Sequence, residues 1–157
     1  MKQSAGILLF RNPLVNLEFL LVHPGGPFFA KKDEGWWTIP KGEPLPNELL
    51  LNTAVREFKE EIGHEISGNF IELNSIMQKG GKQVYCWAVE SDLDITTIIS
   101  NTFKIEWPPR SGKMKEFPEI DKAGWFTLPE AKKLINERQI PFLDELVIYL
   151  ENKKASR

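Results

Sequence analysis

The chain has 157 residues, of which 41% are hydrophobic and 27% charged. These values are ordinary for one soluble globular domain, and the length closes one hydrophobic core with little left for a second. The formal net charge is -2, so no global positive charge attracts nucleic acid. We therefore expect a single domain over residues 1–157 and no nucleic-acid partner.

Cysteine and histidine are scarce. Cys86 is the only cysteine, and His23 and His64 are the only histidines. An intrachain disulfide is excluded, as is a metal site built from cysteine and histidine. The apolar run that precedes Arg11 is too short for the core of a signal peptide or for a membrane span. We expect a cytoplasmic protein with no membrane partner.

The first elements predicted are strands. Short apolar runs at residues 4–11 and 18–23 flank Asn12-Pro13, which favours a turn, so they are expected to pair. A loop rich in proline and glycine follows. Residues 36–40 then predict a short extended segment that ends at a proline.

A helix is predicted over residues 47–62, which have helical apolar spacing. Gly63 follows it, where a glycine commonly ends a helix. The side chains expected to face the core are Leu51, Val55, Phe58 and Ile62.

The remaining chain predicts strands and then helices. Residues 101–118 lack a clean period and predict a long functional loop or an irregular strand. The other expected elements are strands at 70–77 and 83–90 around a turn at 79–82, a last strand at 123–128, and helices at 129–136 and 142–152. This order predicts an α/β fold with helices on both sides of a mixed sheet.

Three glutamates share one face of the predicted helix. Glu57, Glu60 and Glu61 stand at i, i+3 and i+4, and about 100° per residue turns them away from the apolar stripe. Taken alone, the pattern is typical of a solvated acidic face. A hard divalent cation would turn the mutual repulsion into binding, because magnesium prefers carboxylate oxygens.

The segment from residue 42 to 64 resembles the Nudix box, G-x5-E-x7-R-E-U-x-E-E-x-G-U, with U an aliphatic residue. Its fixed positions are filled by Gly42, Glu48, Arg56, Glu57, Glu60, Glu61 and Gly63. A chance match is on the order of one in a billion per window at average composition. Phe58 fills the first U position. His64 replaces the last one, and we interpret it as a packing variation at a helix C-terminus, where a positive histidine complements the dipole.

The resemblance implies a fold, a reaction and site residues. Nudix proteins are α/β/α sandwiches with a mixed sheet, and the enzymes use magnesium or manganese for water attack at phosphorus in a nucleoside diphosphate-X substrate. Arg56 would orient the glutamates through an ion pair, with Glu48 as its partner or as an outer-shell ligand. Glu57 would ligate metal or act as the base, and Glu60 belongs to the same basic set. The metal ligands that the resemblance implies are Gly42, through its carbonyl, and Glu57, Glu60 and Glu61.

Outside the box, Lys41 ends a W-x-x-P-K segment similar to that of diadenosine tetraphosphate and diphosphoinositol polyphosphate hydrolases. It is expected to contact phosphate, the alternative being a solvated lysine. Glu119 precedes a Trp-Phe strand, as a late metal-binding or basic glutamate does in many Nudix proteins. The alternative is an ordinary surface acid, with Glu116 as the fallback. Trp107 and Arg110 are expected to stack a base and bind phosphates, although such residues also serve solubility.

The substrate remains the open part of this prediction. Bacterial Nudix proteins described as NTP pyrophosphohydrolases carry similar segments, which favours nucleoside triphosphates or dinucleoside polyphosphates as small-molecule partners. A diphosphoinositol polyphosphate hydrolase is one alternative, although it would need a denser cluster of lysine and arginine. A non-catalytic nucleotide-binding module is the other, although such modules often lose box glutamates.

Overall fold

The structure is a computed structural model that describes residues 2–156. Within them, seven strands form one mixed sheet: β1 (Gln3–Arg11), β2 (Glu18–Pro24), β3 (Lys41–Gly42), β4 (Ile71–Glu72), β5 (Ile76–Gln78), β6 (Lys82–Glu90) and β9 (Ile120–Phe126). A second sheet pairs β7 (Thr102–Glu106) with β8 (Met114–Pro118). The helices are α1 (Leu50–Ile62), α2 (Leu128–Leu134) and α3 (Ile140–Ala155), with 3-10 turns η1 (Ile95–Thr97) and η2 (Glu137–Gln139). No helix among these residues is long and apolar enough to cross a membrane.

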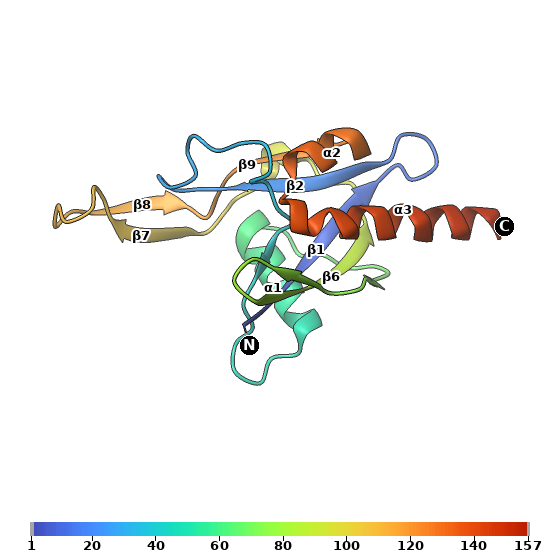
Figure 1. Cartoon of the computed structure of the whole chain (residues 1–157), viewed down its shortest axis with the longest axis horizontal. Helices are drawn as coiled ribbons and strands as arrows, with labels where there is room; N and C mark the ends of the chain where they lie inside the picture. Colours follow the sequence, from blue (N-terminus) through green and yellow to red (C-terminus); the bar gives the residue numbers. More distant parts are fainter. Residues whose placement is uncertain (1, 157) are drawn as a thin grey trace.

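The large sheet lies between two helical layers (Figure 1), as expected for an α/β/α sandwich. Its order is β4-β6-β1-β2-β9, and β1 runs parallel to β6 and antiparallel to β2. Side chains of β1 alternate between two cores, since Leu8 and Phe10 pack toward α2 and α3 while Ile7 and Leu9 pack toward α1. Because both faces are covered, β1 is a continuous apolar run.

Helix α1 begins at Leu50, three residues later than predicted. Asn47 has a positive φ of 63°, a left-handed conformation that cannot belong to a helix. The Glu48 carboxylate then accepts hydrogen bonds from the backbone N–H of Leu45 and the hydroxyl of Thr53. These contacts fold the preceding segment back onto the first turn, so the helix starts after Glu48.

The buried face of α1 is rotated from the predicted stripe. Leu51 and Val55 are half-buried, whereas the buried residues of α1 are Thr53, Ala54, Phe58, Glu61 and Ile62. Glu61 is only 9% exposed, so the expectation that all three glutamates turn away from the packed face is wrong for this one. Helix α1 packs against β3 as well as β1, and this second contact covers Glu61.

Several strand boundaries also differ from prediction. The expected strand at 70–77 is split into β4 and β5, which both pair with β6 but are separated by residues 73–75. The last strand, β9, begins three residues before residue 123 and pairs with β2 along its length. Residues 36–40 form no named strand, and isolated bridges join Trp37 to Ile135 and Thr38 to Val22.

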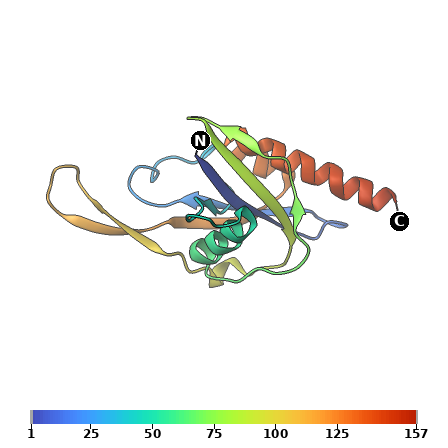
Figure 2. The ribbon, with the colours of Figure 1, turned by 90° about the horizontal axis from the view of Figure 1, so that it is seen from below.

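Residues 101–118 form an antiparallel hairpin, β7–β8, where a loop or irregular strand was predicted. Both figures show it projecting from the body at the end opposite the C-terminus of α3 (Figures 1 and 2). The loop after β2 covers one face of the hairpin. Gly26 lies against the Phe103 ring, and the Phe28 ring meets Trp107 edge-on at 5.4 Å. We call the hairpin together with residues 25–31 the arm.

A buried histidine fixes this loop. His23 is fully buried at the end of β2, and its Nδ1 lies 2.7 Å from the Asp121 carboxylate. Its Nε2 lies 2.5 Å from the backbone carbonyl of Lys32. Both neighbours are hydrogen-bond acceptors, so the buried ring lies between the Asp121 carboxylate and the Lys32 carbonyl. His23 therefore joins the base of the arm to β9.

We expect His23→Phe to lower the free energy of unfolding by about 1–3 kcal/mol, because it leaves two acceptors without a donor. Asp121→Asn is the matched control, because its amide oxygen still accepts a hydrogen bond and a smaller loss is expected. Urea unfolding followed by circular dichroism measures both. An unchanged urea midpoint for His23→Phe would contradict the assignment.

Candidate active site

Gly6, in β1, leaves room for the backbone of residues 40 and 41, which leads into the site. In the register of β1 and β3, Gly6 is opposite Lys41 and Ala5 is opposite Gly42. A Cβ on Gly6 would lie 2.4 Å from the Pro40 carbonyl oxygen, so only glycine fits there. Sequence reasoning missed Gly6, although a glycine inside a strand is a known signal of close backbone approach.

Gln139, fully buried in η2, holds the same segment from the other side. Its Oε1 accepts from the backbone N–H of Ile39 at 3.1 Å, and its Nε2 donates to the Thr38 hydroxyl at 2.9 Å and to Gln78 Oε1 at 3.1 Å. A buried amide with these partners is fully engaged. Gln139 was also missed, because the contacts span about a hundred residues of chain and leave no local pattern.

Gly42 lies directly against Glu57. A Cβ at residue 42 would come within 2.0 Å of the Glu57 carboxyl carbon. Any side chain would therefore displace this carboxylate, which gives a steric reason for glycine at the first position of the box. The backbone of β3 and the side chain of α1 meet here, on the α1 side of the sheet.

Arg56 gathers the other box residues. Its Nε and Nη2 each donate to one oxygen of Glu48 at 2.9 Å, and its Nη2 also donates to the Glu43 carbonyl at 3.0 Å. Its Nη1 donates to Glu57 at 2.9 Å and to Glu60 at 3.2 Å. The whole guanidinium fork is occupied, and such bidentate pairing fixes direction as well as charge. These hydrogen bonds lower the pKa of Glu48 to about 2.

Glu61 lies behind this network in a different environment. Burial, followed by the negative charges of Glu57 and Glu119, raises the pKa of Glu61 to about 9. The Lys41 ammonium and the backbone N–H of Lys41 act in the opposite direction. Burial also lowers the pKa of Lys41, with a further contribution from the positive charge of Lys82. Carboxylates and one lysine thus share a poorly hydrated space beside β3.

Backbone hydrogen bonds bring Glu119 to this space. It follows β8, and its N–H donates to the Asn101 carbonyl at 2.8 Å, while the Asn101 N–H donates to the Glu60 carbonyl at 2.9 Å. The Gly25 N–H donates to the Glu119 carbonyl at 2.8 Å. Burial and the Glu60 carboxylate raise the pKa of Glu119. Glu116, by contrast, is an exposed residue of β8 opposite Lys104.

The remaining predicted residues lie apart from the glutamates. Trp107 directly follows β7 and packs on Phe28, and Arg110 lies in the turn between β7 and β8 with a positive φ of 63°. The hairpin between whose strands they lie projects away from α1 (Figure 2). The His64 ring contacts the Thr97 hydroxyl at 2.9 Å and so joins the end of α1 to η1.

The donor set suits a hard cation, although it is not preassembled. Among residues 2–156, no group of three or more histidine, cysteine, aspartate or glutamate side chains is arranged to hold a metal ion. Arg56 holds two of the carboxylates by hydrogen bonds, and the pKa of Glu61 is raised first by burial and then by repulsion from the negative charges of Glu57 and Glu119. A divalent cation would relieve that repulsion, and all the available donors are oxygens, which magnesium and manganese accept.

Sequence comparison places this geometry in a known family. The NUDIX domain matches residues 2–146. Over 111 residues the chain is 33% identical to the asymmetrical bis(5'-nucleosyl)-tetraphosphatase of Rattus norvegicus, a match that covers 62% of this chain and 71% of that protein. Nudix hydrolase 5 of Arabidopsis thaliana is 29% identical over 116 residues, which cover 73% of this chain and 33% of that protein.

Solved structures share the fold. An Ap4A hydrolase binary complex from C. elegans aligns with a TM-score of 0.57 and 21% identity, covering 97% of this chain and 96% of that chain. A mutT/nudix family protein from Listeria innocua aligns with a TM-score of 0.66 and 14% identity, covering 99% and 98%. Arg56 holds three glutamates of the box together, and the NUDIX domain matches most of the chain. The chain therefore belongs to the Nudix family and is a Nudix pyrophosphohydrolase.

Proposed function

We propose that this protein hydrolyses a phosphoanhydride bond of nucleoside diphosphate-X substrates in a magnesium- or manganese-dependent reaction. The observation that carries the proposal is the Arg56 guanidinium, which donates at once to Glu48, Glu57 and Glu60 beside the backbone of Gly42. The Arg56 side chain therefore orders the carboxylates on which a metal site would depend.

The residues that would hold the metal are Gly42, Glu57, Glu60 and Glu61. When bound, the metal would offset charge on the phosphoryl oxygens. Lys41, close enough to Glu61 to counter its charge, would contact a phosphate oxygen of the substrate. Glu57 or Glu119 would accept the proton of the attacking water, and burial raises the pKa of each carboxyl above its ordinary value.

Dinucleoside polyphosphates are the substrate class that we favour, with nucleoside triphosphates next. The 33% identity to an asymmetrical bis(5'-nucleosyl)-tetraphosphatase supports this choice. In this proposal the arm contacts the base or the far phosphates through Trp107 and Arg110. A diphosphoinositol polyphosphate is disfavoured, since its dense negative charge calls for a concentration of cations that a chain of net charge -2 does not suggest.

We expect Glu57→Gln to lower kcat by roughly a hundredfold or more, because it removes either a metal ligand or the general base. The assay follows phosphate-containing products from diadenosine tetraphosphate and from nucleoside triphosphates, with and without magnesium. Glu65→Gln is the control, because Glu65 is exposed and pairs with Lys59 at the surface. Magnesium-dependent turnover that is equal in wild type and Glu57→Gln would refute the assignment.

The lowered pKa of Glu48 predicts that the fold loses stability in acid. Its folded pKa of about 2 lies below the ordinary 4.5, so its stabilisation is complete above about pH 4.5 and is lost as the pH falls toward 2. We expect Glu48→Gln to be less stable than wild type at neutral pH, with the difference shrinking over that window. Urea unfolding at stepped pH measures it, and a difference that does not change with pH would exclude the ionised Arg56–Glu48 pair as its source.

For the arm, we expect Trp107→Ala to raise KM for diadenosine tetraphosphate about tenfold with kcat nearly unchanged, as for loss of one stacking contact. Met114→Ala, on the same hairpin and 63% exposed, is the matched control. A KM within twofold of wild type would remove Trp107 from the substrate site without affecting the assignment of the glutamates.

A further inference from the structure

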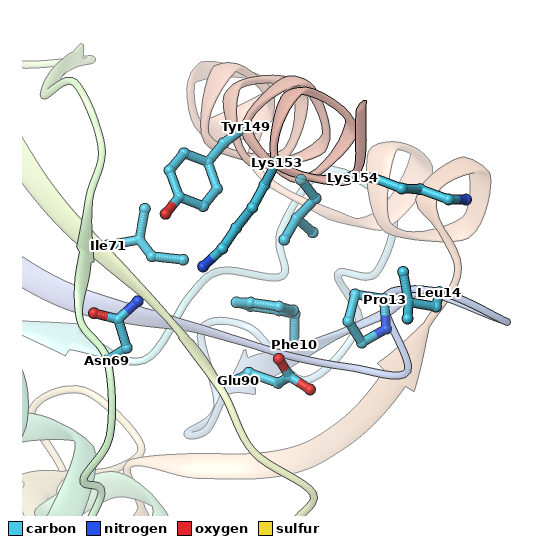
Figure 3. Close-up of a pocket in the computed structure, with 10 residues that line it drawn as sticks. Phe10, Pro13, Leu14, Asn69, Ile71, Glu90, Tyr149, Lys153 and Lys154 are labelled. Carbon is cyan, nitrogen blue, oxygen red and sulfur yellow. The ribbon is translucent and has the colours of Figure 1, made fainter. Parts of the chain in front are cut away.

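A pocket opens near the C-terminal end of α3, at the end of the molecule opposite the arm (Figure 1). It encloses about 210 Å³ between α3, the end of β1 and the segment around β4 (Figure 3). Buried Phe10 forms its floor, and Tyr149 and Lys153 reach over it from α3. Asn69 and Ile71 line one wall, and Glu90 lies low beside Phe10.

This distal pocket is separate from the glutamate site. Gly42 is opposite Ala5 in β1, and Phe10 lies five residues further along that strand, which is about 17 Å at the rise of an extended chain. The two sites also use opposite faces of the sheet, since Phe10 packs toward α2 and α3 whereas Glu57 is on α1. A ligand in the distal pocket would therefore not contact the box.

The polar side chains that line the pocket are available to bind a ligand. Among the described residues, neither Lys153, Lys154 nor Glu90 forms an ion pair, and the Asn69 side chain has no hydrogen-bond partner. The Lys153 ammonium lies 5.9 Å from the centre of the Tyr149 ring, close to the pocket mouth. The two lysines give this surface a positive charge that one carboxylate only partly offsets.

We propose that the distal pocket binds an adenine nucleotide at a site distinct from the catalytic one. The Tyr149 ring, 36% exposed at the pocket, offers a face to a planar base. Asn69 has the donor and acceptor pair that reads the N6 and N7 edge of adenine, and Glu90 accepts a hydrogen bond from an exocyclic amine. The phosphate then lies at the mouth, where Lys153 and Lys154 provide the positive charge.

The test uses adenosine monophosphate as the probe, with the full chain in EDTA so that metal-dependent binding at the box does not contribute. Wild type is expected to bind it in calorimetry and to shift the side-chain amide resonance of Asn69. Tyr149→Ala and Asn69→Ala should each weaken binding about tenfold, the scale of one lost stacking or base contact. Glu57→Gln should leave this binding unchanged.

Two controls make the result decisive. Ile148→Ala, beside Tyr149 on α3 and 57% exposed, should bind the probe as wild type does. Ribose 5-phosphate lacks the base and should bind at least tenfold more weakly, a difference of about 1.4 kcal/mol. The proposal is overturned if adenosine monophosphate does not bind at millimolar concentration, if both pocket variants bind it normally, or if ribose 5-phosphate binds equally well.

Discussion

The hydrogen bonds of Arg56 are the constraint on which the catalytic region depends. One guanidinium donates to three carboxylates that would otherwise repel one another, and it also holds the Glu43 carbonyl just after Gly42. A lysine could not replace it, because a single ammonium lacks the planar fork that fixes several acceptors at once. The positions of the loop before α1 and of the acidic face of α1 are therefore set by the same group.

Among the described residues, Arg56 forms no hydrogen bond with Gly42, and the sheet positions this residue instead. Gly6 lets the backbone of residues 39–41 lie against β1, and Gln139 holds that backbone from the other layer. Segments from both ends of the chain thus converge on one short strand. The geometry of the box belongs to the whole fold, although the residues proposed to carry the chemistry lie mostly within one contiguous motif.

The sequence predicted the local features well and the long-range ones poorly. The helix that carries Glu57 and the glycine that ends it follow from spacing, and the box made their chemistry specific. The burial of Glu61 could not be predicted, because it depends on where α1 crosses β3. The hairpin at residues 101–118 was not predicted, because its two strands have only five residues each and are mostly exposed, and its covering contacts come from the distant loop that holds Phe28.

The attachment of the arm has a consequence for how such an enzyme diversifies. Its root is fixed by backbone hydrogen bonds at Gly25, Asn101 and Glu119, whereas its tip projects from the body of the molecule (Figures 1 and 2). Residues can be inserted or exchanged near Arg110 without changing the register of β2 against β9. Substitutions in the arm would therefore alter the proposed substrate contacts of Trp107 and Arg110 without moving the box residues of α1.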